Sequence, residues 1–103
     1  MAIFCFDHAT ACNALLEALA CGVPVVATET GGVREYTGEE AGILCPPRDA
    51  SAIAREVLRL ISDRTALSRM AVAARRRAVG LDFEMVARLH HRVYTEVIAH
   101  GCW

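Results

Sequence analysis

The stretch 13–32 places the signals of a helix, a chain reversal, a buried strand and a glycine loop within twenty residues. Apolar residues recur at helical spacing up to Cys21, and Gly22 follows where a residue without a Cβ can end a helix in the left-handed conformation. Pro24 is tolerated at the start of a strand, and the apolar run 23–27 is typical of a short parallel strand covered on both faces. Ligands of open α/β sheets collect beyond the carboxyl ends of strands, so loop 28–32 is the first candidate for a ligand contact.

Strands and helices alternate along the rest of the chain. We expect strands at 3–6, 23–27 and 42–45, a helix at 13–21, a helical turn at 33–36, and three longer helices, of which the first follows Asp49, the second ends at Gly80 and the third follows Asp82. Thr10 or Asn13 is expected to cap the first helix and Asp49 the helix that follows it. The stripes expected to face the core are Ile53, Val57, Leu60 and Ile61, then Leu67, Met70, Ala71, Ala74 and Ala78, then Phe83, Val86, Ala87, His90, Tyr94 and Val97. This order predicts an α/β fold with a parallel sheet of about three strands, right-handed crossovers and C-terminal helices.

Composition excludes several classes of function. All eleven basic residues are Arg, so a Walker-type phosphate loop, which needs a lysine, is excluded. The formal net charge of −1 selects no partner class, and successive side chains of the run 75–77 point about 100° apart on a helix. We therefore expect a solvated helix face there and no nucleic-acid partner.

Cysteine spacing and the N-terminus bear on metals and membranes. The five cysteines show neither C-x-x-C nor any other metal-ligand spacing, and most lie in apolar runs, which favours buried reduced thiols and no metal site: Cys5, Cys12, Cys21, Cys45 and Cys102. The apolar start of the chain is interrupted at Asp7, too soon for a signal peptide or a membrane span. We expect no transmembrane segment and a cytoplasmic setting, with peripheral membrane contact left open for a full-length protein.

Three segments together resemble a known family: Leu16 to Ala27, Gly31-Gly32-Val33-Arg34-Glu35, and Gly42 to Asp49. In residue type and spacing they are similar to glycosyltransferases of the GT-B type, specifically the large retaining family 4. The resemblance covers nearly the whole chain and implies a partial Rossmann-like sheet, half of a GT-B donor domain. It implies that residues 1–103 form the C-terminal part of a donor-binding domain, a fragment from which the acceptor domain is missing. A three-strand sheet of this kind is expected to leave an unpaired edge through which the chain self-associates.

Two features at the first helix point to a nucleotide-diphosphate sugar as donor substrate, with no further cofactor. Unpaired N–H groups at a helix N-terminus suit a pyrophosphate, and the residues in that position are Thr10, Ala11, Cys12 and Asn13. Glu17 follows about one turn later, and the resemblance implies that its carboxylate binds the ribose. Gly31 and Gly32 either let a phosphate approach or serve only a positive φ. Glu35 and Tyr36 either face the nucleoside or cap the turn at 33–36.

The sequence departs from the family at one catalytic position. The family has a glutamate eight residues before the ribose-binding one, within Glu-Gly-Phe-Gly, and here Ala9-Thr10-Ala11-Cys12 stands in that place. Asp7 and His8 are near enough in sequence to replace the missing acid by another loop path, and a functional and a purely structural role for Asp7 are equally compatible with the sequence. His90-His91 has no ligand-type partner four residues away, so we expect His90 at the edge of the core. The absence of Asp-x-Asp agrees with the metal-independent habit of the GT-B type.

The sequence therefore predicts a fragment of a retaining glycosyltransferase, which moves a sugar from a nucleotide diphosphate to a hydroxyl acceptor. The isolated chain is expected not to turn over. A noncatalytic nucleotide-sugar-binding or interaction module is the first alternative, favoured by Ala9. A GT-B-like nucleotide-sugar epimerase is the second, and it would need catalytic carboxylates and a histidine that the sequence does not place.

Overall fold

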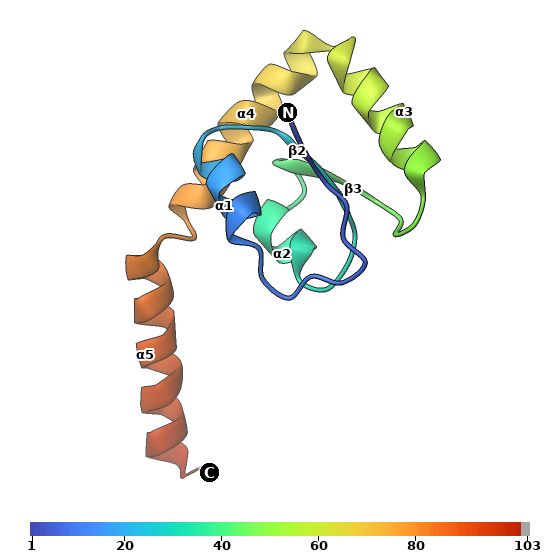
Figure 1. Ribbon diagram of the computed structural model, residues 1–103. Helices are drawn as coiled ribbons and strands as arrows, with labels where there is room; N and C mark the ends of the chain where they lie inside the picture. The colour runs from blue at the N-terminus through green and yellow to red at the C-terminus, as the bar shows by residue number, and fades with distance from the viewer. Residues whose placement is uncertain (102–103) are drawn as a thin grey trace.

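The computed structural model describes residues 1–101 and contains eight elements of secondary structure (Figure 1). They are β1 (Ala2–Phe4), α1 (Asn13–Ala20), β2 (Val25–Thr28), α2 (Val33–Thr37), β3 (Gly42–Cys45), α3 (Ala50–Ile61), α4 (Arg64–Val79) and α5 (Phe83–His100). The alternation of strands and helices is the predicted one. Cys102, expected as a buried thiol, lies outside the described residues.

The sheet has three parallel strands in the order β1-β2-β3, which confirms the predicted α/β fold. β2 is the central strand and is buried along its whole length, as its continuous apolar run predicted. β1 ends at Phe4 and not at Phe6, because Thr28 Oγ1 takes the place of a strand partner: it accepts from Phe6 N at 2.7 Å and donates to Phe6 O at 2.8 Å. β2 starts two residues later than predicted, because Val23 N donates to Ala18 O in the turn that closes α1.

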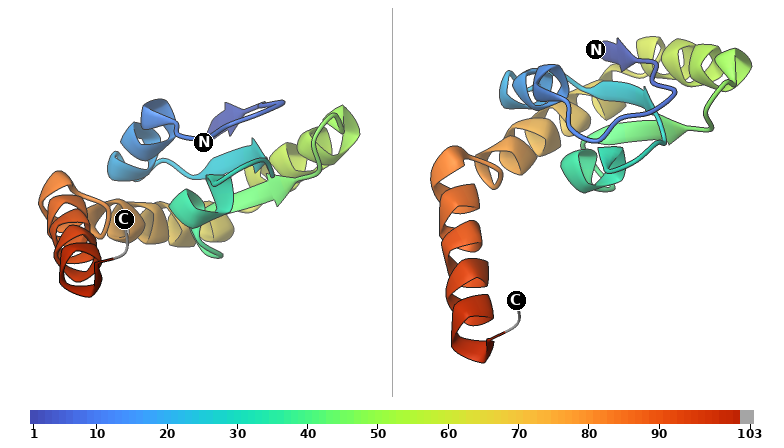
Figure 2. Two further views of the ribbon diagram at one scale, coloured as in Figure 1. Left: turned by 90° about the horizontal axis from the view of Figure 1, so that it is seen from below. Right: turned by 60° about the horizontal axis from the view of Figure 1, so that its bottom comes forward.

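Helices cover both faces of the sheet. Successive side chains of a strand point to opposite faces, so Val25 and Ala27 face one core cluster and Val26 the other. The first cluster joins the sheet to α1, α2 and the second half of α4, and consists of Leu15, Leu19, Val25, Ala27, Val33, Ala41 and Ala74. The second lies under α3 and the start of α4, and consists of Val26, Cys45, Ala52 and Leu60. Figure 2 shows α4 running from the α3 side of the molecule to the start of α5. Ile61, expected in the core, is 59% exposed at the end of α3.

The apolar stripe predicted for α5 is not buried. No residue of α5 is buried within the described range 1–101, and His90, expected at the core edge, is exposed and stacks on Tyr94 with ring centroids 6.2 Å apart. Figure 1 shows α5 leading away from the sheet. The radius of gyration is 16.0 Å, above the roughly 13 Å of a compact domain of this length. Amphipathic spacing predicted a face that needs a cover, but none of the described elements supplies one.

The arginine run on α4 does more than face solvent. All three side chains are exposed, as predicted, yet two of them bind carbonyl groups at the ends of other helices. Arg75 Nη1 donates to Ala20 O of α1 at 2.6 Å, and Arg77 donates through Nε to Tyr36 O at 3.1 Å and through Nη2 to Glu35 O of α2. A cation and a donor at a helix C-terminus are both favourable, so these arginines hold α1 and α2 against α4.

Candidate functional site

The candidate site lies at the carboxyl ends of β1 and β2, where the loops after the two strands touch. Gly31 has φ +51°, and a Cβ on it would lie 1.7 Å from Ala9 O, so only glycine fits this backbone contact. Gly32 has φ −89°, and a Cβ on it would meet Thr10 O at an ordinary 3.8 Å. A positive φ therefore explains Gly31 and does not explain Gly32. The contact brings loop 28–32 and the residues before α1 together at one edge of the sheet.

The N-terminus of α1 differs from those of the longer helices. Asp49, Asp63 and Asp82 cap α3, α4 and α5 by accepting hydrogen bonds from the N–H groups of Ala52, Ala66 and Met85. Asp49 was predicted in this role. In α1 the N-cap residue is Cys12, in an extended conformation with φ −143° and ψ 98°, and no side chain within residues 1–101 caps the helix. Thr10 and Asn13 were wrong predictions for the cap, because the helix begins directly at Asn13. The first turn, which also lacks an acidic residue, keeps its N–H groups and partial positive charge for another acceptor.

Glu17 lies on the wall of a hollow of about 680 Å³ between α1, α4 and the start of α5, which we call the Glu17 hollow. Asn13 and Glu17 are one turn apart on α1 and both line it. The remaining lining residues are Leu16, Ala20, Tyr36, Arg75, Ala78, Val79, Leu81, Asp82, Phe83 and Val86. The sequence left open whether Glu35 and Tyr36 face the nucleoside or cap the turn at 33–36. Tyr36 lines the Glu17 hollow, whereas Glu35 is exposed. Thr10 and Ala11 precede the helix and are exposed, and Cys12 is half-buried.

Asp7 faces a different cavity, of about 340 Å³, beside the start of α3. Its Oδ1 pairs with Arg48 Nε at 3.3 Å, and both side chains are largely exposed. Arg48, which sequence reasoning missed, stands in the turn after Pro46 and Pro47 with φ 59°. Asp7 and Glu17 therefore do not line a common hollow. Asp7 has a salt-bridge partner that accounts for it without any catalytic role.

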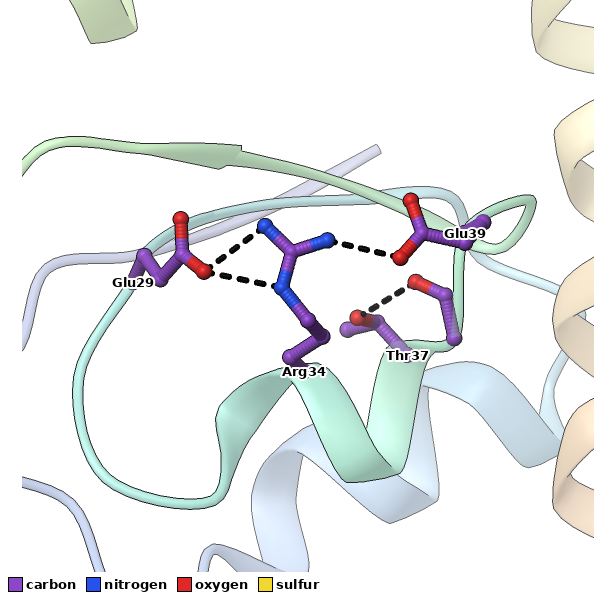
Figure 3. A network of polar contacts seen from close by, with 5 residues as sticks. Glu29, Arg34, Thr37 and Glu39 are labelled. Atoms are coloured by element: carbon purple, nitrogen blue, oxygen red, sulfur yellow. Dashed lines mark hydrogen bonds and ion pairs between the residues drawn. The ribbon is translucent and has the colours of Figure 1, made fainter.

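A polar network fixes the loop after β2 (Figure 3). Arg34 donates to Glu29 Oε1 through Nε at 2.8 Å and to Glu39 Oε1 through Nη1 at 2.7 Å, and these two carboxylates raise the pKa of Arg34. Beside it, the Thr37 hydroxyl donates to Gly38 O at 3.1 Å. The network ties the start of the loop to α2 and to the turn after it. Among residues 1–101, Thr30 Oγ1 in this loop is the one buried side-chain polar atom without a hydrogen-bond partner.

The cysteines are less buried than predicted. Of the four cysteines within residues 1–101, only Cys45 is buried, and its burial raises the pKa of the thiol, whereas Cys12 is half-buried. Cys5 and Cys21 are exposed, since the first follows the edge strand β1 and the second ends α1. Within the described residues, no three His, Cys, Asp or Glu side chains come together in a way that would hold a metal ion. Nor does any helix in that range combine the length and apolar character needed to cross a bilayer.

Known proteins are similar to this chain in sequence and in fold. Residues 1–63 match the family model described as glycosyl transferases group 1. Glycogen synthase from Mycobacterium tuberculosis is 37% identical over 81 residues, which cover 77% of this chain and 20% of that protein. D-inositol 3-phosphate glycosyltransferase from Salinispora arenicola is 35% identical over 85 residues, covering 82% of this chain and 19% of that protein.

A solved structure agrees with these relatives. Sucrose-phosphate synthase from Thermosynechococcus elongatus superposes with a TM-score of 0.76 at 30% identity, covering 90% of this chain and 24% of that one. The chain spans about one fifth of the length of the curated relatives it matches. The expected α/β, partial Rossmann-like fold is confirmed, and so is the expected resemblance to glycosyltransferases of the GT-B type. The chain belongs to the family of group 1 glycosyl transferases.

Proposed function

We propose that this chain is the C-terminal part of the donor-binding domain of a retaining family 4 enzyme, which transfers a sugar from a nucleotide diphosphate to a hydroxyl acceptor in a cytoplasmic setting. The observation that carries the proposal is the pairing of an uncapped helix N-terminus at Cys12 with a carboxylate one turn later, Glu17, on the wall of a hollow. The helix N-terminus suits the anionic diphosphate, and the carboxylate suits the vicinal hydroxyls of the ribose. The diphosphate and the ribose are neighbours in a nucleotide, as these two groups are on α1.

The proposed role of these residues is to position the donor. The diphosphate lies against the N–H groups at the start of α1, between Thr10 and Asn13, and the helix dipole stabilises the charge that develops on it as the sugar leaves. Glu17 accepts hydrogen bonds from the ribose hydroxyls and so fixes the nucleotide along the helix. Gly31 contributes indirectly, because it lets loop 28–32 pack against Ala9 behind the phosphate position. The proposal needs neither a dedicated metal nor a cofactor.

None of the residues proposed to bind the donor supplies an acidic group for the transferred sugar. Ala9 has no acid to offer the sugar, and Asp7 is paired with Arg48 outside the Glu17 hollow. We therefore propose that this chain alone binds the donor and does not turn over. Ala9 also favours a second candidate, a noncatalytic nucleotide-sugar-binding module, which would bind in the same way within a longer protein.

Calorimetric titration with UDP-, GDP- and ADP-glucose tests the proposal. We expect at least one of these nucleotide sugars to bind. Glu17→Gln should weaken its binding by about tenfold or more, because the two charge-assisted hydrogen bonds from the ribose hydroxyls become neutral ones. Glu40→Gln is the matched control, since Glu40 is exposed and lies outside the Glu17 hollow. Equal affinity in wild type and Glu17→Gln would refute the ribose assignment. To separate transferase from binding module, the full-length protein is assayed for release of free nucleoside diphosphate in the presence of acceptor sugars.

A further inference from the structure

Phe83 is the most exposed large apolar side chain in the described range, at 95% exposure. It is the first residue of α5 and stands at the rim of the Glu17 hollow. A large aromatic side chain left in water is unfavourable by itself, and beside a concave surface with a few polar groups it is typical of a ligand contact.

The backbone that carries Phe83 is well held. Leu81 N donates to Ala78 O at 3.0 Å, and Val86 N donates to Asp82 O at 3.0 Å. Asp82 Oδ1 also accepts from Met85 N at 2.7 Å. The elbow between α4 and α5 is therefore ordered on both sides of Phe83. These bonds hold the backbone at the start of α5, from which the Phe83 side chain projects.

The Glu17 hollow is lined by apolar side chains and by two carboxylates. Leu16, Val79 and Val86 supply apolar surface, while Glu17 and Asp82 supply carboxylates. Its volume of about 680 Å³ lies within the range of roughly 300 to 1,000 Å³ common for small-molecule sites. An occupant with a flat apolar face and a polar edge fits such a wall, and a nucleobase has both.

We propose that the Glu17 hollow holds the nucleoside end of the donor, with the base stacked on Phe83 while Glu17 holds the ribose. This inference rests on the proposed function and extends it, because it assigns a base-binding residue on α5. Base stacking on an aromatic ring tolerates every base, since each base offers a π face. The free oxygen of the Asp82 carboxylate then faces the polar edge of the base.

Calorimetry with four variants tests the assignment against UDP, GDP, ADP and inorganic pyrophosphate. Phe83→Ala is expected to weaken binding of every nucleotide that binds by about 5- to 100-fold, the size of a lost base stack. Phe83→Trp keeps the aromatic face and is expected to bind within about twofold of wild type, whereas Phe83→Leu keeps apolar area only and falls between. Tyr94→Ala is the matched control, because Tyr94 is an aromatic residue of the same helix, 64% exposed and outside the hollow. Pyrophosphate carries no base, so its affinity is expected to be equal in wild type and Phe83→Ala.

The outcomes separate this inference from the function on which it rests. If Phe83→Ala binds nucleotides as wild type does while Glu17→Gln binds them weakly, base stacking on Phe83 is overturned and the proposed function stands. If Phe83→Ala weakens pyrophosphate as much as nucleotides, the ring does not contact the base, and the inference is again overturned. If wild type binds no nucleotide, the proposed function fails and the inference fails with it. Circular dichroism of each variant checks that the exposed substitution leaves the fold intact.

Discussion

Arg48 is the only residue other than glycine in the range 1–101 with a positive φ, at 59°. A Cβ in this conformation is crowded by the following carbonyl group, a cost that glycine avoids. We expect the free energy of unfolding of Arg48→Gly to exceed that of Arg48→Ala by about 0.5 to 1 kcal/mol, because both variants lose the exposed pair with Asp7 and only glycine relieves the strain. Urea denaturation measures the difference. Superimposable curves for the two variants would contradict the strain at this position.

The role of a single residue could be predicted from the sequence where it depends only on residues close to it in the chain. Asp49 was predicted as an N-cap because its side chain needs only the N–H three residues later, and it accepts from Ala52 N at 2.9 Å. The reason for Gly31 could not be chosen from the sequence, because it depends on Ala9, a residue 22 positions away whose carbonyl leaves no room for a Cβ. The pairing of Asp7 with Arg48 is equally non-local. The position of Glu17 on a helix was predictable, but not the hollow that it lines.

Among the elements, α4 binds the C-terminal ends of α1 and α2 through Arg75 and Arg77. We expect Arg77→Ala to lower the free energy of unfolding by about 1 kcal/mol, because the carbonyl groups of Glu35 and Tyr36 lose a charged donor at the end of α2. Arg76→Ala is the control on the same helix, since the Arg76 guanidinium has no hydrogen-bond partner among residues 1–101. Thermal and chemical denaturation should rank the two variants. Equal destabilisation by both would mean that the loss comes from helix propensity or general charge and not from these two bonds.

The elements themselves were predicted better than their ends. The strand at 42–45 and the start of α1 at Asn13 are where the pattern placed them, and Pro46 and Pro47 mark the end of the strand. The ends of β1 and β2 differ, because the Thr28 hydroxyl and the Ala18 carbonyl bind backbone groups that a propensity argument assigns to the strands. Hydrogen bonds of this kind, made by a side chain in the first case and by a turn carbonyl in the second, leave no periodic trace in the sequence.

On the scale of the whole molecule, two apolar surfaces lie open. α5 exposes Leu89 at 45% and Val93 at 50%, and the edge strand β1 exposes Ile3 at 49%. The predicted stripe of α5 consists of other residues, namely Phe83, Val86, Ala87, His90, Tyr94 and Val97, and Ile3 was predicted only as part of a strand. Periodicity reports only that a face prefers burial, however, and gives no information on what would cover it. That is why the sequence predicted α5 as a core helix, whereas the structure leaves it outside the core.

These open surfaces predict how the chain behaves in solution. We expect wild type to self-associate with rising concentration and to bind a hydrophobic dye, since an unpaired strand edge and a continuous apolar helix face both favour association. Leu89→Glu with Val93→Glu removes apolar surface from α5, and Ile3→Lys blocks the edge of β1, so each variant should lower one contribution. Sedimentation equilibrium and dye fluorescence measure both effects. If the helix variant alone becomes monomeric, α5 drives association; if Ile3→Lys alone does so, the sheet edge drives it as the sequence predicted. A wild type that stays monomeric, binds no dye and unfolds in one sharp transition would show that neither surface promotes self-association.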